Sequence, residues 1–170
     1  MASTASGARG NGRTADERTP AQWYCLLGGL SLLLAGILGF IADSGFDTGN
    51  AIQGDKLIVF EVNGWHNLIH IASGLLLLSA FRRRGPAKTV AIAFGLVYGL
   101  VTVIGLIDGE DVLGIIPVNP ADNILHILLT ALGLFTGLTS RGDYADADRT
   151  PAGRTQEPAA SDLDRGERVR

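Results

Sequence analysis

The stretch NGWHNLIHIASGLLLLSAF, residues 63–81, decides how this chain folds, because polar side chains open a run that is otherwise largely apolar. A related stretch, NPADNILHILLTALGLFTGLTS, residues 119–140, begins in the same way. All 3 histidines of the chain lie in these two stretches. Polar groups that enter a membrane-length apolar segment are energetically unfavourable without partners, so their repetition needs a physical reason.

The two stretches match at an offset of 56 residues, which is 119 minus 63. The matched pairs are Val62 and Val118, Asn63 and Asn119, Asn67 and Asn123, His70 and His126, and Ile71 and Ile127. The similarity extends to the preceding segments, where ILGFI (residues 37–41) resembles VIGLI (residues 103–107) at an offset of 66. We interpret the chain as two tandem helical hairpins that enter the membrane in the same orientation, related by a pseudo-two-fold axis along the membrane normal.

Four apolar runs have about the length of a membrane span. They cover residues 23–42, 63–81, 89–107 and 120–140. Each is close to the ~20 residues that cross a hydrocarbon core of ~30 Å. We therefore predict an all-α fold, a polytopic membrane four-helix bundle in residues 21–140. The flanking residues 1–20 and 141–170 are polar and lack an apolar run, so we predict disordered tails.

The positions of lysine and arginine predict the orientation. Cations are concentrated before the first run, between the second and third, and after the fourth; they include Arg9, Arg13, Arg18, Arg82, Arg83, Arg84, Lys88 and Arg141. The other two connections hold only Lys56 against seven acidic residues, which are Asp43, Asp47, Asp55, Glu61, Asp108, Glu110 and Asp111. We therefore expect a multi-pass protein of the cell membrane with both termini in the cytoplasm.

Asn63 and Asn119 are predicted helix N-caps, because asparagine accepts hydrogen bonds from the free backbone N–H groups of a first helical turn. Pro120 at the first helical position supports the second cap. The candidate site consists of the deeper polar residues His66, Asn67, His70, Asp122, Asn123 and His126. Residues three and four apart share one helical face, so each set points into the bundle from the outer half of its span.

Three hypotheses explain this face. The first, which we favour, is a structural clamp of interhelical hydrogen bonds that holds the two hairpins together and needs no cofactor. Two arrangements are open for His66 and Asp122: a hydrogen bond across the pseudo-axis, which favours protonated His66, or two separately solvated residues. The second is a divalent metal ion bound by His66, His70, Asp122 and His126. Its variant is a haem in electron transfer, with His70 and His126 as axial ligands. The third is a path for a small solute through an oligomer of the chain.

The sequence carries no motif of the common soluble enzymes. A phosphate-binding glycine loop, a nucleophile elbow, an HExxH motif and paired CxxC motifs are all missing, so we expect a non-enzymatic protein. No basic stripe with interleaved aromatic residues occurs, so we expect no nucleic-acid partner. The expected partners are the lipid bilayer and further copies of the chain. Cys25 is the only cysteine, which excludes an intramolecular disulfide.

The paired motifs resemble those of a bacterial four-span membrane family catalogued as domain of unknown function 4383. The resemblance rests on the spacing of Asn63, His66, Asn67 and His70, on that of Asn119, Asp122, Asn123 and His126, and on GILGF at residues 36–40. It covers roughly residues 23–140. It implies an integral membrane protein and no particular activity.

Overall fold

Residues 17–142 are described by a computed structural model, and they contain four helices and two short antiparallel ribbons. The helices are α1 (Pro20–Ala42), α2 (Gly64–Ala80), α3 (Arg84–Asp108) and α4 (Pro120–Thr139). The ribbons pair β1 (Asp55–Leu57) with β2 (Phe60–Val62), and β3 (Asp111–Val112) with β4 (Ile116–Pro117). The predictions for the two tails fall almost entirely outside the described residues.

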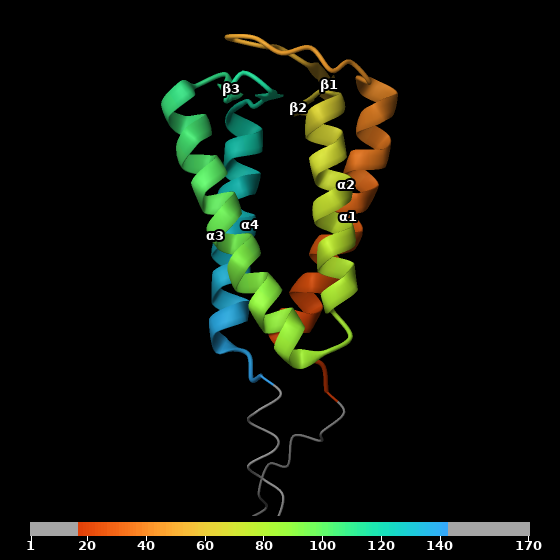
Figure 1. The fold of residues 1–170 in the computed structure, drawn as a ribbon, viewed down its shortest axis with the longest axis vertical. Coiled ribbons are helices and arrows are strands. Elements are labelled where there is room, and N and C mark those ends of the chain that lie inside the picture. Colours follow the sequence, from red (N-terminus) through yellow and green to blue (C-terminus); the bar gives the residue numbers. More distant parts are fainter. Residues whose placement is uncertain (1–16, 143–170) are drawn as a thin grey trace, which may run out of the picture.

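α1 packs against α2 and α3 packs against α4, so the chain forms two helical hairpins, as Figure 1 shows. Glycines allow the closest approaches. A Cβ atom built on Gly74 of α2 would stand 2.6 Å from the backbone nitrogen of Leu33 in α1. One built on Gly137 of α4 would stand 3.1 Å from the backbone nitrogen of Ile92 in α3. Close backbone contact supplies the packing between helices where apolar burial adds little.

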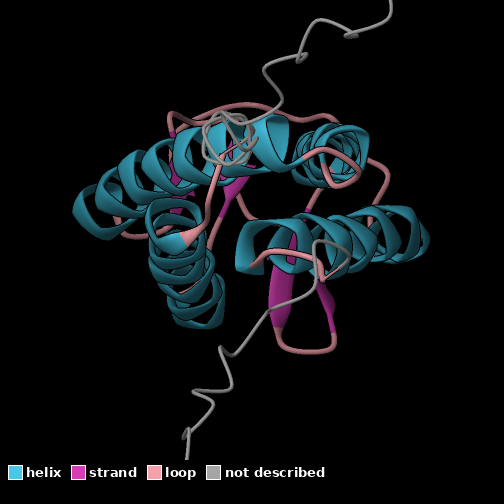
Figure 2. Cartoon of the chain, turned by 90° about the horizontal axis from the view of Figure 1, so that it is seen from below, coloured by secondary structure: helices cyan, strands magenta, loops and turns pink. Residues whose placement is uncertain are grey.

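The two ribbons are a part of the fold that the all-α prediction missed. Each ribbon follows the first helix of its hairpin, and both lie at the same end of the helices (Figures 1 and 2), here called the ribbon end. The ribbon turns place Ile58 and Leu113 in left-handed backbone conformations, with φ of 63° and 59°. Hairpin turns are recognised in a sequence by glycine or asparagine at such positions, so the first turn had no sequence signature. The second turn has Gly114 next to Leu113, with φ of 67°, which is a weak signature.

Three of the helices in residues 17–142, namely α1, α3 and α4, are long and apolar enough to cross a membrane. Many of their large apolar side chains are exposed, including those of Leu34, Leu100 and Leu138. α2, with 17 residues, is the shortest. α3 starts at Arg84, five residues before the predicted boundary at residue 89, because the proline at position 86 is compatible with a first helical turn.

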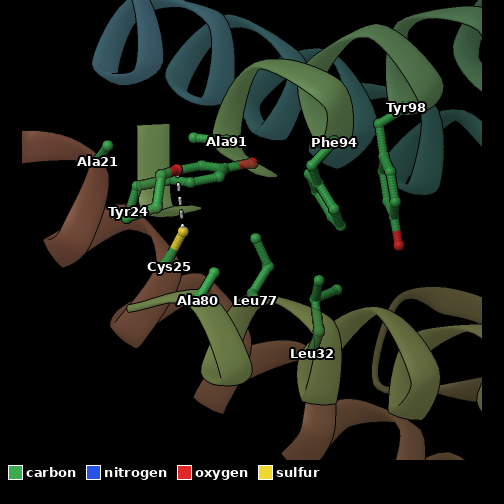
Figure 3. Close-up of a cluster of buried hydrophobic side chains, with 10 residues drawn as sticks. Ala21, Tyr24, Cys25, Leu32, Leu77, Ala80, Ala91, Phe94 and Tyr98 are labelled. Carbon is green, nitrogen blue, oxygen red and sulfur yellow. Dashed lines mark hydrogen bonds between the residues drawn. The ribbon is translucent and has the colours of Figure 1, made fainter. Parts of the chain in front are cut away.

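A core of buried side chains lies between the helices (Figure 3), and several of its members come from the helix ends opposite the ribbons. Its members are Ala21, Tyr24, Cys25, Leu32, Leu77, Ala80, Ala87, Ala91, Phe94 and Tyr98. Three hydrogen bonds join α1 to the second hairpin here. The Tyr24 hydroxyl donates to the carbonyl of Leu129 at 2.8 Å, and the Ala21 N–H donates to the hydroxyl of Ser140 at 2.8 Å. The Cys25 thiol donates to the carbonyl of Ala87 at 3.6 Å. The hairpins are therefore fastened at this end.

The two ends of the helices differ in charge. The segments at the ribbon end contain Asp43, Asp47, Asp55, Glu61, Asp108, Glu110 and Asp111, with Lys56 as their only cation. The opposite end, here called the cationic end, contains Arg18, Arg82, Arg83, Arg84, Lys88 and Arg141. The ends of α1 and α4 nearest the chain termini lie at the cationic end (Figure 1).

Gly74→Ala should destabilise the first hairpin by about 1–3 kcal/mol, because overpacking forces the two backbones apart. Gly28→Ala is the matched control in α1, since its Cβ would lie 3.6 Å from a Leu77 methyl group, an ordinary contact. The measurement is unfolding in mild detergent, followed by circular dichroism. Equal stability of the two variants would show that the close approach of α1 and α2 is unimportant.

Candidate functional site

Asn63 and Asn119 occupy the N-caps of α2 and α4 at the ribbon end. The side-chain oxygen of Asn63 accepts a hydrogen bond from the backbone N–H of His66 at 2.9 Å. That of Asn119 accepts from the N–H groups of Ala121 and Asp122, at 2.8 and 3.1 Å. The Asp122 carboxylate accepts from the Asn119 N–H at 3.0 Å, which completes a capping box. These bonds satisfy backbone donors that have no partner within the helix.

The same two asparagines join the hairpins to each other. The side-chain NH2 group of Asn63 donates to the carbonyl of Ile115, between β3 and β4, at 2.9 Å. That of Asn119 donates to the carbonyl of Val59, between β1 and β2, also at 2.9 Å. Ile115 follows Val59 by 56 residues, the offset that also separates the two asparagines. Each asparagine therefore caps its own helix with its oxygen and holds the other hairpin's ribbon with its nitrogen.

Asp122 and His66 are linked through the backbone of Glu61. The Asp122 carboxylate accepts the Glu61 N–H at 3.0 Å, and the Glu61 carbonyl lies 2.9 Å from Nδ1 of His66. Neither arrangement that the sequence left open for this pair is found, because both residues are buried and the backbone of Glu61 connects them. A carbonyl only accepts, so Nδ1 of His66 carries the hydrogen and the lone pair of the neutral ring is on Nε2.

Asn67 and Asn123 each face a glycine in the preceding helix of their hairpin. A Cβ atom on Gly39 would overlap Oδ1 of Asn67. A Cβ atom on Gly105 would lie 2.9 Å from Oδ1 of Asn123. The NH2 group of Asn67 also donates to the carbonyl of Asp43 at 2.7 Å, just beyond the end of α1. Only glycine leaves room for these amides, and the two glycines are separated by the 66-residue offset found in the sequence.

His66, His70 and His126 form a compact group, here called the histidine cluster. One nitrogen from each ring lies within 4.8 Å of the others, and the rings of His66 and His70 have centroids 4.4 Å apart. All three residues are buried, with at most 6% of their surface exposed. Each ring also has a buried nitrogen with no hydrogen-bond partner among residues 17–142. Asp122, the fourth predicted metal ligand, is not part of this group.

Two residues near the cluster were missed by the sequence analysis. Tyr98 of α3 meets the ring of His126 edge-on with centroids 5.3 Å apart, and its hydroxyl donates to the hydroxyl of Ser73 at 3.3 Å. Tyr98 could have been found from the sequence, because its hydroxyl lies in a predicted span without charged residues. Glu61 acts through its backbone N–H and carbonyl, which no side-chain pattern can indicate.

Comparison with known families confirms the resemblance inferred from the paired motifs. A family model described as a domain of unknown function, DUF4383, matches residues 22–139. The chain belongs to this family, and the matched region contains both ribbons, α2, α3, α4 and all but the first two residues of α1. No curated protein and no solved structure was found to match the chain.

Asp122→Ala should lower the free energy of unfolding by about 2–4 kcal/mol, because it removes the acceptor of two backbone N–H groups, each costing about 1–3 kcal/mol when buried and unpaired. Asp122→Asn should retain most of the stability, since the amide oxygen still accepts. The measurement is denaturant unfolding in detergent. Glu110→Ala, at an exposed acid on the same end, is the control. Similar losses in Asp122→Ala and Glu110→Ala would contradict this role.

Proposed function

We propose that the chain is a non-enzymatic, four-span protein of the cell membrane whose two hairpins are held together by a polar clamp at the outer surface. The clamp consists of the side chains of Asn63, Asn119 and Asp122, together with the backbone groups of Val59, Glu61 and Ile115 that they bind. The reciprocal bonds from the two asparagine side chains to the opposite ribbons carry this proposal.

The connectivity supports a fourth span. α1 ends at the ribbon end, whereas α3 begins at the cationic end, so the intervening chain returns across the same distance. α2 makes this return alongside α1, and its residues Leu68, Leu75 and Leu76 are exposed and apolar. Its 17 residues extend for about 25 Å at ~1.5 Å per residue. A span a few ångströms too short is accommodated by local thinning of the bilayer.

The charge difference supports the orientation. The cationic end belongs in the cytoplasm under the positive-inside rule, since its arginines lie in short segments next to the spans. The acidic ribbon end then faces outward, and both termini are cytoplasmic. In this orientation the clamp lies near the outer interface, where the first turns of α2 and α4 leave water.

The clamp fixes the register of the two hairpins. Each asparagine binds its own helix and the opposite ribbon, so sliding one hairpin along the other breaks both cross-hairpin bonds. A backbone hydrogen bond from the Gly49 N–H to the carbonyl of Gly114, at 2.9 Å, joins the two connections beside it. Interhelical side-chain hydrogen bonds in membranes contribute on the order of 0.5–2 kcal/mol each. Their placement at the ribbon end complements the contacts of the apolar core.

Asn63→Asp and Asn119→Asp test the clamp directly, because aspartate keeps the capping oxygen but replaces the NH2 donor with a negatively charged oxygen that only accepts. Spin labels are attached to cysteines at the exposed positions Ile58 and Leu113, on the two ribbon turns, in a Cys25→Ala background. We expect the label-to-label distance distribution from pulsed electron resonance to broaden and lengthen in the double variant. Asn50→Asp makes the same chemical change at an exposed asparagine and should leave the distribution unchanged. Unaltered distances in the double variant would overturn the clamp.

The topology is tested by single cysteines in intact cells, again in the Cys25→Ala background. A cysteine replacing Lys56 should react with a membrane-impermeant thiol reagent, because it lies on the first ribbon outside. A cysteine replacing Arg83 should react only after the membrane is permeabilised. The reverse pattern, or equal reactivity at the two positions, would contradict four spans with an external ribbon end.

A further inference from the structure

The clamp does not account for the histidine cluster. The clamp residues use their side-chain atoms in hydrogen bonds, whereas each of the three rings has a buried nitrogen without a partner in the described part of the chain. A nitrogen that has left water without gaining a partner is unfavourable. Three such rings facing one another at the junction of α2 and α4 indicate a ligand that binds imidazole nitrogens.

We propose that His66, His70 and His126 bind one divalent transition-metal ion of the Zn²⁺ or Cu²⁺ class. Imidazole is a preferred ligand of these ions, and three histidines with a remaining open position form an established zinc coordination set. His66 and His70 are four residues apart on α2, which places both rings on one face. His126 approaches from α4, so the ion would be shared between the two hairpins.

The distances permit an ion after small movements. Three atoms that lie within 4.8 Å of one another share a common point at about 2.8 Å from each of them. A Zn–N bond is about 2.0–2.1 Å long. Each nitrogen would therefore move inward by less than about 1 Å to bind one ion.

The surroundings of His66 are those of a metal-binding histidine. Its Nδ1–H donates to the carbonyl of Glu61, which directs the lone pair to the unpaired Nε2. The Glu61 N–H in turn donates to the Asp122 carboxylate. Metal-ligating histidines commonly donate their second nitrogen to a carbonyl or carboxylate, which orients the ring and increases its basicity. The edge of Tyr98 closes the cluster beside His126.

The same geometry argues against haem. A porphyrin held by His70 and His126 needs a wide, flat space around the axis that joins their nitrogens. The ring of His66 lies 4.4 Å from that of His70 and 6.2 Å from that of His126, measured between centroids, and occupies part of this space. A single ion fits the cluster without displacing His66.

Metal analysis of the purified full-length protein tests the proposal. The protein carries an affinity tag without histidine, because the chain has only 3 histidines of its own and a polyhistidine tag would mask them. After loading with Zn²⁺ and removal of loose ions by a weak chelator, we expect about one zinc per chain. His70→Ala and His126→Ala should each reduce the retained zinc at least about tenfold, the scale that even outer-shell losses reach. Thr130→Val, which alters another buried unpaired polar atom of α4, should retain it.

A spectrum of the unaltered protein makes the test independent of variants that fail to fold. With Cu²⁺ as the probe, electron paramagnetic resonance should show hyperfine splitting from several imidazole nitrogens. Zinc below the chelator blank, zinc retained in both histidine variants, or a copper spectrum without nitrogen splitting would each overturn the proposal. A Soret band in the purified protein would show that the cluster binds haem, which would also overturn the proposal of a single metal ion.

The metal site goes beyond the clamp and can fail separately from it. The clamp is judged by the distance between the two ribbon turns, whereas the metal site is judged by stoichiometry and the copper spectrum. The Asn63→Asp, Asn119→Asp double variant keeps all three histidines. If the double variant keeps the ribbon distances and the unaltered protein binds zinc, only the clamp is contradicted. If the distances broaden in the double variant and the unaltered protein binds no zinc, only the metal site is contradicted.

Discussion

Partnering of buried polar groups is the constraint on which the ribbon end of this protein depends, because a buried N–H or C=O group without a partner lowers the stability of the fold. The first turns of α2 and α4 have free N–H groups, and one asparagine oxygen in each helix accepts from them. The amide has a second polar atom, which needs a partner of its own. This atom, the side-chain nitrogen, donates to a carbonyl of the opposite ribbon. Each helix cap is therefore also a contact between the two hairpins.

The two copies of the motif differ at one position for a reason that the backbone supplies. The Asp122 carboxylate accepts the N–H of Glu61 from the other hairpin. The residue that corresponds to Glu61 at the 56-residue offset is Pro117, which has no N–H to donate. A carboxylate at position 66 would therefore lack the equivalent partner. His66 instead donates to the carbonyl of Glu61 in its own hairpin, and its second nitrogen is left for the interior.

The sequence predicted the features that depend on local geometry. Helical spacing places His66, Asn67 and His70 on one face whatever surrounds them, and the apolar lengths predicted the helices. The ribbons were missed because strands of two or three residues have almost no periodicity and their turns use Ile58 and Leu113. The exclusion of Asp122 from the histidine cluster depends on a backbone donor in the other hairpin. Such a contact follows from how the hairpins pack, which no local pattern encodes.

The histidine cluster is difficult to explain by packing alone. Apolar side chains of similar volume would fill the space between α2 and α4 without burying a polar atom. An unpaired buried polar group costs about 1–3 kcal/mol, so three imidazoles gathered without a ligand would weaken the junction that the clamp strengthens. Asn63 and Asn119 cap the two helices that bear the rings, and their side chains bind the opposite ribbons. In the proposed metal site, this connection between the hairpins would help to hold the ligands of the ion in place.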